Sequence, residues 1–450
     1  MASNRLSRLQ AITGIDFHVA ATLLFRVWGI VAGGVMVFAI PAALGPQQQG
    51  YYFTFASLLG LQIFFELGLN QVVVQLVSHE MAYLSWGPRG ELVGESAHSD
   101  RLKSIVALLR RWYGVAATLF LLLTSLAGAV LFDRTGSLPR EFWVGPWLAL
   151  VGVTAINLYF SPMLAVVEGC GRVGQVARLR LAQSMIGYGL MWAALYAGAG
   201  LWAIPLGAGT AGLCTALWLR SGTHLLRAFE ITTPISPGCG VDWKREVLPF
   251  QWRIAVSWIS GYLIFQLFTP FVFVNLGPVA AGRLGIALAI FNALMSVGVS
   301  WINAKIPALT AHVTRGERTE LNRSFGSVAR RSAAFTTASS ATVVLVVYLL
   351  GVFGVPHVDR IADLPTLACI AISTSATIFI YAWASYMRAH REEPMLAVSV
   401  VGGIVTLIAA YLASRHGTFM TMLVQTVVTL VISVPWTLRL FQRYYRRPAP

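Results

Sequence analysis

Long apolar segments alternate with short polar ones along almost the whole chain. A segment of about 20 apolar residues crosses the roughly 30 Å of hydrocarbon in a bilayer when it forms an α-helix. The pattern predicts twelve such spans: 19–41, 50–77, 113–132, 143–168, 180–198, 201–219, 251–276, 281–309, 332–353, 364–387, 395–413 and 418–438. The first ten residues are polar, so we expect the first apolar segment to be a span and not a cleavable signal peptide. We therefore predict an all-α, polytopic membrane protein.

The composition and the positions of the charges support this prediction. Hydrophobic residues make up 56% of the chain, charged residues only 11%, and the mean hydropathy is +0.68; a soluble domain has about 25% charged residues. Of the 33 Lys and Arg residues, 26 lie in segments that are cytoplasmic if the N-terminus is inside, and four lie in the outer loops. This asymmetry places both termini in the cytoplasm. The net charge of +15 thus follows from topology and indicates anionic lipid of the inner leaflet, not nucleic acid, as a partner.

A short turn occurs twice. Residues 44–50 read LGPQQQG between the first two spans, and residues 276–282 read LGPVAAG between spans seven and eight. Six crossings separate the turns, which predicts a parallel repeat of two six-helix lobes with a site between them near the midplane. The lobes are 1–230 and 251–450, joined by a cytoplasmic linker over 231–250. Pro suits such a turn because it fixes φ, and Gly because it permits positive φ. Chance is the competing explanation, because both residues are common in turns.

The first hairpin resembles a known family. An arginine lies early in the first span (Arg26), a Leu-Gly turn precedes Gly50 and Tyr51, and the second span closes with FELGLNQVVVQLVSHE. In these features the chain is similar to bacterial polysaccharide flippases of the O-antigen type, from the multidrug/oligosaccharidyl-lipid/polysaccharide exporter superfamily. The resemblance implies transport of undecaprenyl-pyrophosphate-linked oligosaccharides to the outer leaflet of the cytoplasmic membrane by alternating access through a cationic lumen. It also implies no cofactor, with a polysaccharide polymerase and a chain-length regulator as candidate partners.

Two opposite charges are predicted at one depth in the first hairpin. Arg26 precedes Pro41 by 15 residues and Glu66 follows Gly50 by 16, so both lie ~22–24 Å below the turn. An internal ion pair is one interpretation. The other is a substrate site, in which Arg26 binds the pyrophosphate and Glu66 orients it or exchanges a proton. Asn70, one helical turn beyond Glu66, extends a polar stripe that we assign to the same cleft.

The repeat maps the eighth span onto the second and places Gly298 opposite Glu66. Lys305 shares the face of Gly298, and Arg283 lies near it. Both cations are therefore candidates to line the cleft, and the alternative for each is snorkelling to the nearer interface. A second polar stripe, which lines the cleft or bonds between helices, consists of Asn292, Ser296, Ser300 and Asn303.

Two further residues have candidate roles in transport. Arg253, at the cytoplasmic start of the seventh span, is a topological charge or a contact at the entrance for the substrate. Pro270 is expected to kink that span and act as a hinge. The four cysteines match no zinc pattern, and we expect neither a metal site nor disulfides.

Other functional classes fit the sequence less well. The predicted outer loops have about ten residues or fewer, and the loops 78–112 and 220–250 lack clustered acid–base residues, which argues against a polytopic polysaccharide-biosynthesis enzyme. GCGRVG at 169–174 follows a span and not a strand, so it does not predict dinucleotide binding. A drug/cation antiporter of the same superfamily is the main alternative, although such a protein needs uncompensated carboxylates in the lumen, where we predict only Glu66.

Overall fold

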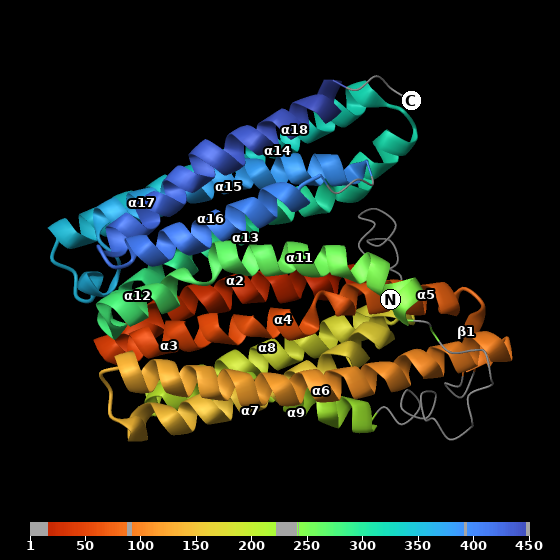
Figure 1. Cartoon of the computed structure of the whole chain (residues 1–450), viewed down its shortest axis with the longest axis horizontal. Helices are drawn as coiled ribbons and strands as arrows, with labels where there is room; N and C mark the ends of the chain where they lie inside the picture. The colour runs from red at the N-terminus through yellow and green to blue at the C-terminus, as the bar shows by residue number, and fades with distance from the viewer. Residues whose placement is uncertain (1–16, 88–91, 222–240, 242, 391–393, 447–450) are drawn as a thin grey trace, which may run out of the picture. The chain divides into compact units, whose positions relative to one another are not determined.

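The computed structural model describes residues 17–87, 92–221, 241, 243–390 and 394–446 (Figure 1). Helices coincide with all twelve predicted spans. In the first half they are α2 (Phe17–Ala43), α3 (Pro46–Leu59), η1 (Gly60–Gln62), α4 (Ile63–Glu66), α5 (Leu69–Met81), α6 (Ser96–Thr135), α7 (Arg140–Gly169), α8 (Val173–Tyr196), η2 (Gly200–Trp202) and α9 (Ala203–Ser221). In the second half they are η3 (Trp243–Val247), α11 (Leu248–Phe265), α12 (Phe268–Leu276), α13 (Pro278–Thr314), α14 (Arg318–Val352), η4 (Val358–Arg360), α15 (Leu364–Ala389), α16 (Leu396–Ala413), α17 (Thr418–Val428), η5 (Thr429–Ser433) and α18 (Val434–Arg446). The predicted all-α membrane fold is confirmed.

Not every span is a continuous helix. Within the described residues, eight helices are long and apolar enough to cross a membrane, and two bent pairs bring the number to as many as ten. One pair is Pro46–Glu66 with Leu69–Met81, bent by 43°, and the other is Ile254–Phe265 with Phe268–Leu276, bent by 40°. The α2 and α8 helices occupy the remaining two predicted spans. Within the described residues, spans two and seven are therefore the two that are bent between helices.

The chain forms two compact units by its contacts. The first unit contains Met1–Met36, Leu61–Val130 and Pro139–Ala255. The second contains Val37–Gly60, Leu131–Leu138 and Val256–Pro450. The tip of the first hairpin therefore groups with the second half of the chain. The predicted lobe boundary at the 231–250 linker stays a prediction.

Small residues bring the helices of the first unit close together. Gly187 on α8 faces Gly207 on α9, and a Cβ on Gly187 would lie 2.9 Å from the carbonyl oxygen of Gly207. Across the same interface, the Gln183 amide donates to the Thr215 hydroxyl at 2.7 Å and to the Ala211 carbonyl at 2.9 Å. Close packing of small residues with hydrogen bonds between helices is the usual way that membrane helices associate.

Aromatic side chains form the packed end of the second unit. Tyr386 on α15 is fully buried, with its ring centroid 4.8 Å from that of Phe325 on α14 and 5.2 Å from that of Phe441 on α18. Arg318, at the start of α14, donates to the carbonyl oxygen of Tyr444 on α18 at 3.1 Å. These contacts fix α14, α15 and α18 to one another.

A small hairpin lies in the segment 78–112, which the sequence predicts to be a loop. Its strands β1 (Leu84–Trp86) and β2 (Leu92–Gly94) are antiparallel, with Trp86 opposite Leu92. The Trp86 indole donates to the carbonyl oxygen of Cys170 at 3.2 Å, and the Arg172 guanidinium lies 4.1 Å from the centre of the ring system. The hairpin is thereby held against the connection between α7 and α8.

Candidate functional site

The two repeated turns contact each other within the second unit. A Cβ on Gly50 would overlap the carbonyl oxygen of Pro278 and would lie 2.5 Å from its carbonyl carbon. A Cβ on Gly282, the repeat equivalent of Gly50, would lie 2.8 Å from the Gly50 nitrogen. The expected positive φ occurs at Gly277, with φ 87°, but not at Gly45, with φ −65°. The glycines that end the two motifs are thus required for close approach of α3 and α13, and not for the turn itself.

Polar contacts reinforce this meeting of the turns. The buried Gln49 amide donates to the carbonyl oxygen of Gly282 at 2.8 Å and to that of Arg360 at 3.0 Å. The Arg360 guanidinium donates to the carbonyl oxygen of Leu44 at 3.2 Å. We call the packing of Gly50 against Pro278 and Gly282, with these hydrogen bonds, the turn contact. It joins the first hairpin to the second half of the chain at one end of the helices.

The second span breaks beside its carboxylate. Leu67 and Gly68 both have left-handed backbone conformations, with φ 50° and 66°, and they separate α4 from α5. Glu66 ends α4, and its Oε1 accepts hydrogen bonds from Asn70 Nδ2 at 2.7 Å and from Ser161 Oγ at 3.2 Å. Within a membrane, backbone of this kind is tolerated only where it is buried in protein or lines a water-filled cavity. The break is therefore a candidate site.

The cluster around the break combines predicted and unpredicted residues. Glu66 and Asn70 are brought together as predicted, and Tyr113 on α6 donates to Asn70 Oδ1 at 3.0 Å. Ser161 and Tyr113 were missed, because hydroxyl residues within apolar helices show no distinctive spacing. We call Glu66, Asn70, Ser161 and Tyr113 the Glu66 cluster. A carboxylate offers about four lone-pair sites, so Glu66 retains capacity for a proton or a cation.

The predicted partner of Glu66 is not described. The backbone of Arg26 lies in α2, but its side chain is outside the part of the chain that the structure describes. Both interpretations of Arg26, ion pair and pyrophosphate ligand, therefore stay predictions.

The α13 helix carries both remaining predicted cations. Arg283 and Lys305 are exposed, and neither forms an ion pair among the described residues. About 33 Å of helix separates them. Gly298, between them, is buried against α14, where Ser332 donates to its carbonyl oxygen at 2.7 Å. The Gly298 face is thus a packing face at its centre, and the role of both cations in a cleft stays a prediction.

The second polar stripe of α13 is partly exposed and partly paired. Asn292 and Ser296 are exposed, whereas Asn303 accepts a hydrogen bond from the Tyr381 hydroxyl on α15 at 2.8 Å. The stripe therefore includes a hydrogen bond between helices near one end, and it presents exposed polar side chains further along.

The seventh span is broken where a proline predicts it. Pro270 is the third residue of α12, and the break lies at Gln266 and Leu267. A proline ring clashes with the carbonyl of the residue four positions before it, which here is Gln266. The kink is therefore where the sequence places it, while a hinge function stays a prediction. The side chain of Arg253 lies outside the described residues.

The prediction that the loops 78–112 and 220–250 lack clustered acid–base residues is wrong, because the fold brings charged side chains of both loops together. Glu80, at the end of α5, is buried with its carboxylate 2.6 Å from His98 Nδ1 and 2.9 Å from Arg101 Nε. Arg101 also forms an ion pair with Glu246 in η3. Within the first unit, this cluster fastens the start of the seventh span to the segment that follows the second.

In the described part of the chain, no group of three or more His, Cys, Asp and Glu side chains is placed to hold a metal ion. Cys170 and Cys369 are buried and Cys214 is half-buried, all with free thiols, while Cys239 lies outside the described residues.

Comparisons with known proteins agree on the fold. No protein-family model matches the sequence, and no curated protein matches it significantly. Among solved structures, an inward-facing multidrug-resistance MATE family transporter of the MOP superfamily is 13% identical, with 95% of this chain and 98% of that chain covered and a TM-score of 0.64. The lipid II flippase MurJ in an inward closed conformation is 11% identical over 94% and 87%, with a TM-score of 0.61. A MOP superfamily transporter from Pyrococcus furiosus, described as having a binding pocket of reversed polarity, is 13% identical over 96% of both chains, with a TM-score of 0.52. The chain therefore has the fold of MOP-superfamily transporters.

Proposed function

We propose that this protein is a flippase that moves a polyprenyl-pyrophosphate-linked oligosaccharide from the inner to the outer leaflet of the cytoplasmic membrane. The observation that carries the proposal is the balance of charge on the described spans. Arg283 and Lys305 are exposed on α13 without an ion-pair partner among the described residues, whereas Glu66 is already engaged by two donors. No other carboxylate in the described chain lies in the interior of a predicted span. An anionic head group matches this balance better than a cationic drug does.

The proposed mechanism is alternating access, with the N-terminus and C-terminus in the cytoplasm. The turn contact closes the outer end and separates when the site opens to the outer leaflet. The breaks in spans two and seven supply the bends that such a movement needs. The pyrophosphate first meets Arg26 and Lys305 on the cytoplasmic side and Arg283 near the exit, and sugar hydroxyls pair with Asn70 and neighbouring polar groups.

Drug/cation antiport is the second candidate. It is favoured by the similarity to the MATE family transporter and by the unused acceptor capacity of Glu66. For proteins with this fold, the charge of the pocket is a better guide to the substrate than structural similarity is. The Pyrococcus protein is described as having a binding pocket of reversed polarity, which suggests a different function.

The test is complementation in a host that lacks its own oligosaccharide flippase. We expect Arg26→Ala and Lys305→Ala to abolish surface polysaccharide while the protein still inserts. Arg323→Ala is the matched control, because Arg323 is highly exposed and its one ion pair among the described residues is with Glu320, across one helical turn. Normal surface polysaccharide in both cleft variants, or efflux of cationic dyes by the wild type without complementation, would reject the flippase assignment.

A further inference from the structure

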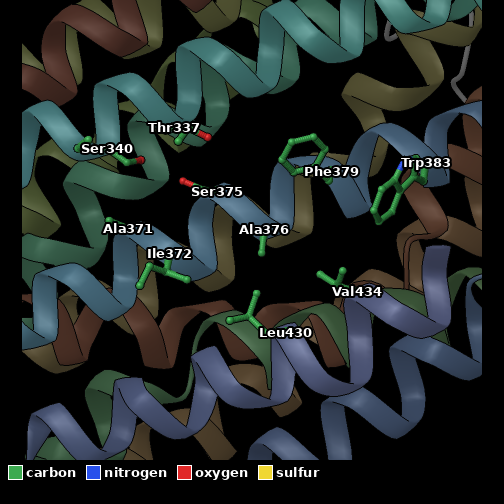
Figure 2. A pocket seen from close by; sticks show the side chains of 11 residues that line it. Thr337, Ser340, Ala371, Ile372, Ser375, Ala376, Phe379, Trp383, Leu430 and Val434 are labelled. Carbon is green, nitrogen blue, oxygen red and sulfur yellow. The ribbon is translucent and has the colours of Figure 1, made fainter.

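An apolar groove runs along the second unit between α14, α15 and the η5–α18 segment (Figure 2). Its volume is about 500 Å³. The floor comes from α15 and the walls from α14 on one side and from η5 and α18 on the other. The residues that shape it most are Ser340, Ile372, Ala376, Phe379, Leu430 and Val434.

The rim of the groove is apolar and open. Ile372 is 49% exposed, Phe379 40% and Leu430 43%. All three lie in helices that are long and apolar enough to cross a membrane. An exposed apolar patch of this kind faces hydrocarbon or marks a binding site for an apolar partner. An occupant that matches this surface is apolar and lies within the bilayer.

Two local features shape the groove. Ala371, Ser375 and Ala376 put small side chains on the floor. The wall contains the π-helical turn Thr429–Ser433, which includes Leu430. Single π turns within α-helices occur frequently at functional sites. The small floor residues and the π-helical turn together set the shape of the groove.

Three hydroxyl groups line the side between α14 and α15. Figure 2 shows those of Thr337, Ser340 and Ser375 in the space between these helices. The Ser340 side chain is fully buried, and its hydroxyl has no hydrogen-bond partner among the described residues. Hydroxyls without a partner can donate weakly to π electrons. An unsaturated isoprenoid chain supplies such electrons, and a saturated acyl chain does not.

Positive charge lies beyond one end of the groove. On α14, the exposed Arg330 precedes Thr337 by seven residues, which is about 10 Å along the same face. At the same end, Trp383 closes the groove floor and stacks on Phe441 with ring centroids 5.9 Å apart. An apolar channel that leads to a cation complements a long-chain lipid with a phosphate head.

We infer that this groove binds the polyisoprenoid tail of the transported lipid while the head group crosses through the protein. The inference rests on the proposed function and adds where the tail is held: on the hydrocarbon-facing side of the second unit.

The experiment compares two lipids with the same head group. Native mass spectrometry of the purified protein measures binding of decaprenyl phosphate and of dipalmitoyl phosphatidic acid, whose chains are saturated; both lipids carry a phosphate monoester. Ala376→Leu fills the groove floor. Ala409→Leu is the matched control, because Ala409 is also half-buried in a predicted span but does not line the groove. A second pair of variants removes exposed apolar side chains without adding bulk. Ile372→Ser changes the groove, and Ile408→Ser, outside the groove, is its control. The two isoleucines are comparably exposed, at 49% and 56%.

We expect Ala376→Leu and Ile372→Ser to weaken decaprenyl phosphate binding by about tenfold or more, as for a methylene-sized change in an apolar pocket. Phosphatidic acid binding and both controls should be unchanged. Equal weakening for the two lipids, or no weakening for either, would overturn the inference while leaving the flippase proposal intact. If the wild type bound decaprenyl phosphate no better than phosphatidic acid, the proposed substrate class itself would be wrong.

Discussion

Replacement of Gly50 by alanine tests the turn contact directly, because it adds a methyl group where the structure has no space. The new Cβ would overlap the Pro278 carbonyl oxygen and would lie 2.5 Å from its carbonyl carbon and 2.8 Å from its Cα. These are backbone atoms at the start of α13, so they cannot rotate away as a flexible side chain does. Overpacking of this kind costs about 3 kcal/mol, the upper part of the usual range. The balance between closed and separated turns should therefore shift by roughly a hundredfold toward separation.

Accessibility of a cysteine beneath the turn measures this shift. Ala281 is 0% exposed beside the contact, so Ala281→Cys should react with a membrane-impermeant maleimide only when the turns separate. We expect faster labelling from the outside when Gly50→Ala is added. Gly152→Ala is the control, because a Cβ there meets nothing within 4 Å. Equal labelling rates in the parent, the Gly50→Ala protein and the control would refute the close approach of the two turns.

Two further predictions concern buried charges. The double variant Arg26→Ala with Glu66→Ala should insert in larger amounts than Glu66→Ala alone, because removal of both partners relieves an unpaired charge; equal amounts on an immunoblot of membranes would reject the ion pair. Arg101→Ala should lower the free energy of unfolding by about 2 kcal/mol, because Glu80 loses a charged partner. This loss is smaller than that for a fully buried ion pair, because the Arg101 side chain is 32% exposed. Thermal unfolding in detergent measures this loss. Arg323→Ala, which breaks an exposed ion pair, is the control variant. An equal loss of stability in this control would contradict the special role of Glu80.

Hydropathy was sufficient to predict the spans. Each predicted segment coincides with a helix, since the length and apolarity of a span are set by the bilayer and not by contacts elsewhere in the chain. The kink before Pro270 was equally predictable, because proline acts on the local backbone. The break at Leu67 and Gly68 was not, because hydropathy does not register backbone dihedral angles.

Tertiary contacts account for the remaining differences. The repeated turn was visible in the sequence. Gly50 and Gly282, however, permit the close approach of two segments that are distant in the sequence, and local sequence patterns do not predict such a contact. Ser161 and Tyr113 join Glu66 from distant helices, and a hydroxyl residue in an apolar span gives no sign of its partner. Glu80, Arg101 and Glu246 come from separate segments of the chain, so their spacing in the sequence did not predict the cluster.

The most direct test of the flippase proposal is translocation by the purified protein in sealed vesicles. A fluorescent polyprenyl-pyrophosphate-linked oligosaccharide is incorporated, and an impermeant quencher reports the fraction in the accessible leaflet over time. We predict that wild-type protein exchanges the lipid between leaflets much faster than empty vesicles, and that Lys305→Ala does not. A wild-type exchange rate equal to that of empty vesicles, with the protein folded and correctly inserted, would contradict the account.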